Sequence, residues 1–301
     1  SRTASSKKKI IKGGFFMTRR RFPVGKTLLY VFMSLWALTT IYPFIWVILN
    51  SFKPRGLIRS DTFSLPIGDK FTLENYVTAF KRVDIGTAYV NSIVISGAVT
   101  VVVMVLAGLA AYAMVRYSFR LRGFLHSMII ASMMFPVFST IIPVFRMESS
   151  WGIVNTGSIW LTRLSVVLPQ IAGNLSFAII VLMGFIRSLP VDLEEAAYLE
   201  GYNVYQIFFR IIMPLAKPSF ATVGIFTFLW SYNDLFLQMF FLRSKKFFTI
   251  TRLLNEISSQ AGTNYGLMVA AVVMVVIPVL VVYIFLQNYI IKGMTAGAVK
   301  G

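Results

Sequence analysis

The stretch VNSIVISGAVTVVVMVLAGLAAYAM, residues 90–114, decides the fold class because it runs for 25 residues without a charged side chain. A helix needs about 20 mostly apolar residues to cross the roughly 30 Å hydrocarbon layer of a bilayer, where the backbone finds no water to bond. We predict that residues 90–114 form a transmembrane helix.

Five further stretches satisfy the same requirement, at residues 27–50, 124–145, 164–186, 218–242 and 266–291. Only the stretch at 218–242 contains a charge, Asp234. The sequence therefore predicts an all-α integral membrane protein with six transmembrane helices. Four prolines inside the stretches favour a packed bundle, because neighbouring helices can satisfy the carbonyl groups that a proline frees: Pro136, Pro143, Pro169 and Pro278.

The composition of the whole chain agrees with a membrane protein and excludes several kinds of site. Hydrophobic residues make up 57% of the 301 residues and charged residues only 13%, whereas a soluble domain carries about 25% charged residues. The chain has no Cys and one His, which excludes thiolate catalysis and Cys or His metal clusters. We expect no catalytic residue and no metal site.

The basic residues predict the orientation. Residues 1–26 contain nine Lys and Arg and no acid, half of the net charge of +18. Such a segment ahead of a span is typical of a cytoplasmic tail, because basic residues resist translocation and are attracted to anionic lipid. We therefore expect no nucleic-acid binding, a transmembrane domain at 27–292, and a second cytoplasmic tail at 293–301.

With this orientation the external segments hold more basic residues than the rule predicts. Six external acids are Asp61, Asp69, Glu74, Asp84, Glu148 and Glu256. Twelve external basic residues are Lys53, Arg55, Arg59, Lys70, Lys81, Arg82, Arg146, Arg163, Arg243, Lys245, Lys246 and Arg252. This excess suggests either an acidic protein partner or an anionic ligand outside the membrane.

The longest internal loop, residues 189–217 between the fourth and fifth spans, has the sequence pattern of two short helices. Asp192 with Glu195 predicts a capping box, and Gly201 stands where a helix ends in a left-handed residue. Asn203 with Gln206 repeats the cap, and an apolar stripe follows that ends at Pro214. From these residues alone, the loop is either a rigid element that a partner could grip or an ordinary interfacial amphipathic segment.

The same loop resembles the EAA loop of ABC-importer membrane subunits, whose pattern is E-A-A-x3-G-x9-I-x-L-P. The matching residues are Glu195, Ala196, Ala197, Gly201, Ile211 and Pro214, and only Met213 departs from the pattern. Shorter matches favour the carbohydrate-uptake branch, in particular the smaller six-span subunit of the maltose-transporter type: Tyr42-Pro43, Asn91-Ser92, residues 110–113, Ile142-Pro143, Asn155-Thr156 and residues 230–234.

The resemblance implies a set of partners and a coupling role. In that family the loop docks on a cytoplasmic ATPase, which binds ATP and Mg, so we expect no cofactor in this chain. The resemblance further implies a second homologous permease subunit, two ATPase subunits, an extracytoplasmic solute-binding protein and a location in the bacterial inner membrane. It assigns the coupling to Glu195, Ala196, Ala197, Gly201 and Pro214.

The transport pathway is predicted from the polar residues of the spans. An acid at membrane depth, such as Asp234, is functional by default because burying it unpaired is costly. Aromatic faces beside hydrogen-bonding groups suit a sugar, and the candidates are Trp230, Tyr232, Asn233, Asp234, Gln170 and Asn174, with Asn91 as a weaker one. The alternative is that Asn233 and Asp234 lock this helix to a partner subunit by interhelical bonds.

The external loop at residues 51–89 is too long for a simple connection, and the resemblance implies that it meets the solute-binding protein. The predicted substrate is an oligosaccharide, and the sequence leaves neutral and acidic (uronate-like) sugars equally open. Two other functions compete with this one: import of another solute, such as a sugar phosphate, a polyamine or an amino acid, and a membrane-embedded enzyme acting on lipid-linked sugar.

Overall fold

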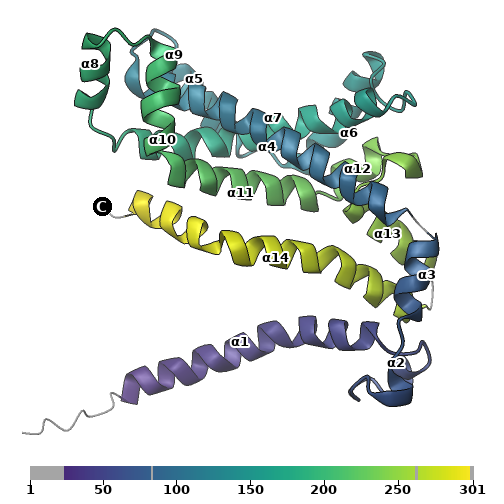
Figure 1. Cartoon of the computed structure of the whole chain (residues 1–301). Coiled ribbons are helices and arrows are strands. Elements are labelled where there is room, and N and C mark those ends of the chain that lie inside the picture. Colours follow the sequence, from purple (N-terminus) through teal and green to yellow (C-terminus); the bar gives the residue numbers. More distant parts are fainter. Residues whose placement is uncertain (1–23, 83, 262–263, 299–301) are drawn as a thin grey trace, which may run out of the picture. The chain divides into compact units, whose positions relative to one another are not determined.

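A computed structural model describes residues 24–82, 84–261 and 264–298. The described residues form helices joined by short segments, with no β-strand among them (Figure 1). The chain divides into two compact units, residues 1–46 and 47–301. Most of the predicted basic tail lies outside the described residues.

The first predicted span is the helix α1 (Val24–Ser51). Large apolar side chains along this helix are exposed, among them Leu28 at 65% and Trp36 at 66%. A helix that is apolar all round is typical of a membrane span, in which lipid or other helices cover the side chains.

Three more predicted spans are confirmed as long helices: α4 (Ile85–Arg116), α7 (Ile159–Ile186) and α14 (Tyr265–Ala298). Helix α4 packs along α7, and α11 (Lys217–Asn233) lies against α4, α7 and α14 (Figure 1). Within the described residues, four helices are long and apolar enough to cross a membrane, and two bent helix pairs bring the number to as many as six.

The third predicted span is not one helix. Residues 124–145 are divided between α5 (Arg122–Ser132) and α6 (Val137–Ser150), which are bent by 104°. Pro136 has no backbone N–H to continue the α-helical ladder, so the chain turns between the two helices. The hydroxyl groups of Ser132 and Ser176, 2.5 Å apart, hold this break against α7.

The fifth predicted span is also shorter than expected. Helix α11 ends at Asn233, and a separate short helix, α12 (Phe236–Phe241), follows. Asp234 lies between them with extended backbone (ψ 106°), and its Oδ1 accepts a hydrogen bond from the Leu237 N–H, 3.2 Å away. Asp234 is therefore at a helix end, where free amide groups can satisfy its charge.

The long segment predicted to be external is folded, as its length suggested. It contains α2 (Leu57–Ser60), a 3₁₀ turn (Gly68–Lys70) and α3 (Glu74–Arg82). The Lys53 ammonium group is buried and donates to the carbonyl oxygens of Asp61 (3.0 Å) and Thr62 (2.8 Å). Burial lowers the pKa of Lys53. This charge organises the loop and is not available to attract a partner.

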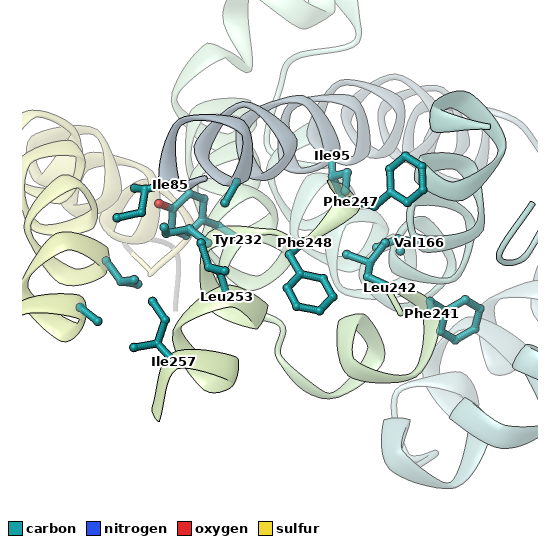
Figure 2. Close-up of a cluster of buried hydrophobic side chains, with 14 of the residues drawn as sticks. Ile85, Ile95, Val166, Tyr232, Phe241, Leu242, Phe247, Phe248, Leu253 and Ile257 are labelled. Carbon is teal, nitrogen blue, oxygen red and sulfur yellow. The ribbon is translucent and has the colours of Figure 1, made fainter. Parts of the chain in front are cut away.

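Two buried clusters hold the second unit together. Figure 2 shows the first, which joins α4 and α7 to α12 and to α13 (Ile250–Ala261) through side chains that include Tyr232, Phe241, Phe247, Phe248 and Leu253. The second surrounds the C-terminal half of α4 and includes Tyr112, Ile207, Phe208 and Phe220. Lipid is as apolar as these side chains, so close packing must supply the association between helices.

Candidate functional site

The loop at 189–217 contains two short helical segments, which lie at the end of the bundle opposite α3 and α13 (Figure 1). The first is α8 (Asp192–Leu199), and the second runs from α9 (Val204–Ile207) through a π-helical turn (Phe208–Ile212) into α10 (Met213–Leu215). Gly201 separates them with a φ of 85°, the left-handed conformation expected for it.

One predicted cap is confirmed and the other is wrong. Asn203 Oδ1 accepts from the Gln206 N–H at 2.9 Å, and Gln206 Oε1 accepts from the Asn203 N–H at 2.8 Å. At α8, by contrast, Asp192 is the first helical residue and no side chain caps the helix. The acids of this first turn can still interact favourably with the positive end of the helix dipole.

The second helix also runs past its predicted end at Pro214 and continues to Leu215. A proline ring inside an α-helix clashes with the carbonyl group four residues earlier, which is that of Arg210. The π-helical turn at 208–212 widens the helix there. The sharp bend of 82° comes later, between Leu215 and Lys217.

The residues assigned to coupling divide between the two faces of α8. Glu195 and Ala196 are exposed, and 91% of the surface of Leu199 is exposed. Ala197 is buried, with only 4% of its surface exposed. Helix α8 therefore packs on the bundle through Ala197 and leaves Glu195 and Ala196 exposed.

Glu194, which the sequence does not single out, is the buried acid of this segment. Its side chain is buried, with Oε1 2.6 Å from Arg116 Nε and Oε2 2.8 Å from the Tyr112 hydroxyl group. Tyr112 and Arg116 are four residues apart and therefore on one face at the end of α4. The pair Tyr112 and Arg116 indicates that a nearby acid could bond there, but the sequence does not show whether that acid is Glu194 or Glu195.

Several of the predicted pathway residues on α7 and α11 are joined by hydrogen bonds within the chain, although the buried Tyr232 hydroxyl group has no partner among the described residues. Gln170 Nε2 donates to Asp234 Oδ2 at 3.0 Å, and Gln170 Oε1 accepts from the Ser231 hydroxyl group at 2.5 Å. Asn174 Nδ2 donates to the backbone oxygen of Gln170 at 2.7 Å. Asp234 thus makes an interhelical bond inside this chain, to Gln170 of α7.

The network extends to α12 and α13. Gln238 Nε2 donates to the Ser231 carbonyl group at 3.2 Å, and Gln238 Oε1 accepts from the Thr249 hydroxyl group. The Thr251 hydroxyl group donates to the Tyr232 carbonyl group at 2.7 Å, and the Tyr232 side chain is buried. The Gln170 side chain therefore joins α7 to the end of α11, and the Tyr232 carbonyl group joins α11 to α13, whereas the Asn174 bond stays within α7.

Only Trp230 and Asn233 of the predicted pathway set are exposed, the indole at 47%. The Trp230 ring packs against Phe177 at 4.8 Å and against Phe226 at 5.7 Å between centroids. Trp230 and Asn233 are three residues apart on one side of α11. An aromatic face beside an amide can stack on a sugar ring and bond its hydroxyl groups.

Asn91, a weaker pathway candidate, joins α4 to other parts of the fold through hydrogen bonds. Its Nδ2 donates to the carbonyl oxygens of Lys246 (3.2 Å) and Phe248 (3.0 Å), and its Oδ1 accepts from Arg163 at 2.9 Å. The adjacent Ser92 hydroxyl group accepts from the Ile250 N–H at 2.8 Å. The pair Asn91-Ser92 thus fastens the segment between α12 and α13 to the start of α4.

Replacing Asn91 by Ala is expected to lower the stability by about 2–4 kcal/mol, since it leaves two carbonyl groups and the Arg163 guanidinium group without their partner. Thermal unfolding of the purified chain in detergent measures this loss. Asn233→Ala is the matched control, because that exposed amide bonds only the Leu229 carbonyl group of its own helix. Equal midpoints for the two variants would contradict the structural role of Asn91.

The external basic residues are also less available than their number suggests. Besides the buried Lys53, Arg163 bonds Asn91, and Arg252 lies 3.2 Å from Glu256 in an ion pair. Lys70 pairs with Asp61 at 2.6 Å and lowers the pKa of that carboxyl group. Several of these charges therefore act inside the fold.

Residues 103–296 match the family described as "Binding-protein-dependent transport system inner membrane component". The match covers the second half of α4, the loop containing α8 and most of α14.

Several proteins that are similar to this chain over most of its length are named as sugar permeases. The chain is 33% identical to the diacetylchitobiose uptake system permease protein NgcG of Streptomyces coelicolor, over 90% of this chain and 88% of that protein. It is 31% identical to the melibiose/raffinose/stachyose import permease protein MelC of Bacillus subtilis (86% and 91% covered). It is 32% identical to the trehalose transport system permease protein SugB of Mycobacterium tuberculosis (87% and 93%).

The fold is also that of a solved transporter. A chain of a bacterial ABC transporter involved in the import of the acidic polysaccharide alginate superposes with a TM-score of 0.76 at 24% identity, covering 88% of this chain and 96% of that one. A second structure, in complex with an alginate pentasaccharide-bound periplasmic protein, gives 0.64 at 17% identity, covering 88% and 94%.

Proposed function

The chain belongs to the family of binding-protein-dependent transport system inner membrane components, and on that basis we propose that it is a membrane-spanning subunit of an ATP-driven oligosaccharide importer. It is a multi-pass inner membrane protein and a transporter permease subunit. We propose that both termini are cytoplasmic, and that a second permease subunit and two ATPase subunits complete the transporter.

The observation that carries the ATPase partnership is the exposed side of α8. Glu195 and Ala196 are presented to solvent beside a left-handed Gly201, while Ala197 seats the helix on the bundle. A small exposed side chain next to an acid allows close approach and a charge-assisted contact with a basic groove. ATP and Mg would be bound by the ATPase subunits, whose closure would displace α8 and change the side to which the pathway opens.

We propose that the folded external segment receives the solute-binding protein. Residues 51–82 are organised by the buried Lys53 and by Asn75, whose amide donates to the carbonyl groups of Ser51 (2.9 Å) and Lys53 (2.8 Å). A preorganised surface loses little conformational entropy on docking.

The substrate we propose is a neutral oligosaccharide. The relatives described above are named for neutral or acetylated sugars, and several external basic residues are engaged inside the fold. Trp230 and Asn233 would contact the sugar as it passes. Gln170, which bonds both Asp234 and Ser231, would support that surface.

Purification of the tagged chain from its native membrane tests the assignment. A second permease and an ATPase are expected in stoichiometric amounts, and ATP hydrolysis by the assembly with its binding protein is expected to rise severalfold with a neutral oligosaccharide. Stimulation by a uronate oligomer alone would make the substrate acidic. Recovery of the chain by itself or with enzymes of lipid-linked sugar metabolism would overturn the transporter assignment.

A further inference from the structure

Glu194 joins three parts of the chain that are distant in sequence. Its carboxylate accepts from Arg116 Nε at 2.6 Å and from the Tyr112 hydroxyl group at 2.8 Å, both at the end of α4. The same guanidinium group donates through a terminal nitrogen to the Leu189 carbonyl group at 2.9 Å, just after α7. The ends of α4 and α7 and the helix α8 therefore meet at one ion pair.

Because this ion pair is buried, the loss of either partner is strongly unfavourable. The side chains of Arg116 and Glu194 are only 10% and 5% exposed. A buried charge is tolerated when its partner is in place and becomes strongly unfavourable when the partner is removed. Arg116 uses two different nitrogens for its two bonds, a geometry that a lysine ammonium group cannot reproduce. The contact thus holds α8 in position and also pairs the buried charge of Glu194.

Helix α8 has one side committed to α4 and one side free. Glu194 and Ala197, three residues apart, are buried, each with only 4% of its surface exposed. Glu195 and Leu199 are exposed. Whatever binds the exposed side therefore acts on a helix that is already fastened from behind to α4.

The covalent connection from α8 to the next span is less direct. It passes through the left-handed Gly201, and it turns by 82° between Leu215 and Lys217 before α11 begins. Element-terminal positions of this kind can absorb changes in φ and ψ. A displacement of α8 that travelled only along the chain would be weakened at both places.

We propose that Glu194 is a positioning residue that transmits the displacement of α8 to α4 through Arg116 and Tyr112. This inference rests on the proposed function, because the displacement comes from the ATPase partner. Glu194 makes its contacts inside the chain, while its neighbour Glu195 faces the partner. The two adjacent acids thus have separate tasks, and loss of Glu194 should uncouple the transporter without releasing the ATPase.

The test uses the reconstituted transporter and measures sugar moved for each ATP hydrolysed. Glu194→Gln keeps the size of the side chain and removes its charge, so the assembly is expected to form while this ratio falls about tenfold, within the usual range of coupling between sites. Arg120→Gln is the control, since it also removes a charge but from an exposed side chain between α4 and α5, outside α8, and it should leave the ratio unchanged. An unchanged ratio in Glu194→Gln would overturn the proposal.

Two further variants separate coupling from folding. Arg116→Lys retains the charge but can keep only one of the two bonds, so a smaller fall in the ratio is expected. Exchanging the charges, by Glu194→Arg together with Arg116→Glu, is expected to recover part of the lost ratio. If Arg116→Lys couples normally, the proposal fails even where Glu194→Gln does not assemble.

The same experiments distinguish the loss of the positioning role of Glu194 from the loss of the importer assignment. An ATPase that co-purifies and couples normally with every Glu194 and Arg116 variant would leave the importer assignment standing and remove only the positioning role. A wild-type chain that recovers no ATPase would remove the importer assignment itself.

Discussion

Gly201→Asp is expected to abolish substrate-stimulated ATP hydrolysis by the assembled transporter while leaving the chain inserted in the membrane. Gly201 has a φ of 85°, and a Cβ added there would meet no atom within 4 Å. The new side chain would therefore project from the surface that we assign to the ATPase. It would add a negative charge near Glu195 and Glu200 and disfavour the left-handed backbone by about 1–2 kcal/mol. Stimulated hydrolysis and the amount of chain in the membrane are the two measurements.

Gly201→Asn isolates the effect of the charge, because Asn has nearly the same size as Asp, adopts the left-handed conformation about as readily and carries no charge. It is expected to retain most of the stimulation. Equal loss in both variants would mean that the surface excludes any side chain at this position. Full stimulation in Gly201→Asp would show that α8 and Gly201 do not meet the ATPase.

The spans were predictable wherever composition alone determines the structure. Helices α1, α4, α7 and α14 follow from runs of apolar residues, because a backbone in lipid must satisfy its hydrogen bonds internally. The two breaks were not predicted. Pro136 and Asp234 both stand inside apolar runs, and hydropathy does not distinguish a proline that kinks a helix from one that ends it.

The candidate site was predictable as a segment but not residue by residue. The sequence indicated two short helices and the left-handed Gly201, since caps and glycines act locally. It did not indicate that Glu194 turns inward and Glu195 outward, because that depends on where α8 packs against Tyr112 and Arg116. For the same reason, the sequence does not indicate that Gln170 bonds Asp234 or that Asn174 bonds the Gln170 carbonyl group.

Gly108→Ala is expected to destabilise the protein by up to about 2 kcal/mol. A Cβ at Gly108 would lie 2.8 Å from the Phe220 ring and 2.9 Å from the Phe208 ring. Both rings are buried, at 3% and 1% exposure, and belong to different helical segments, so they cannot both move aside without repacking. Overpacking of a core costs about 1–3 kcal/mol, which exceeds the gain of about 1 kcal/mol from replacing Gly by Ala in a helix. The free energy of unfolding in detergent measures the balance.

Gly97 provides the control on the same helix, because a Cβ added there meets nothing within 4 Å. Gly97→Ala is expected to be neutral or to stabilise the protein by up to about 1 kcal/mol, through the helical preference of Ala alone. The difference between the two variants then isolates the close packing of α4 against Phe208 and Phe220. If Gly108→Ala were as stable as Gly97→Ala, α4 could not be the closely packed centre to which α8 is fastened, and transmission from α8 through α4 would lose its physical basis.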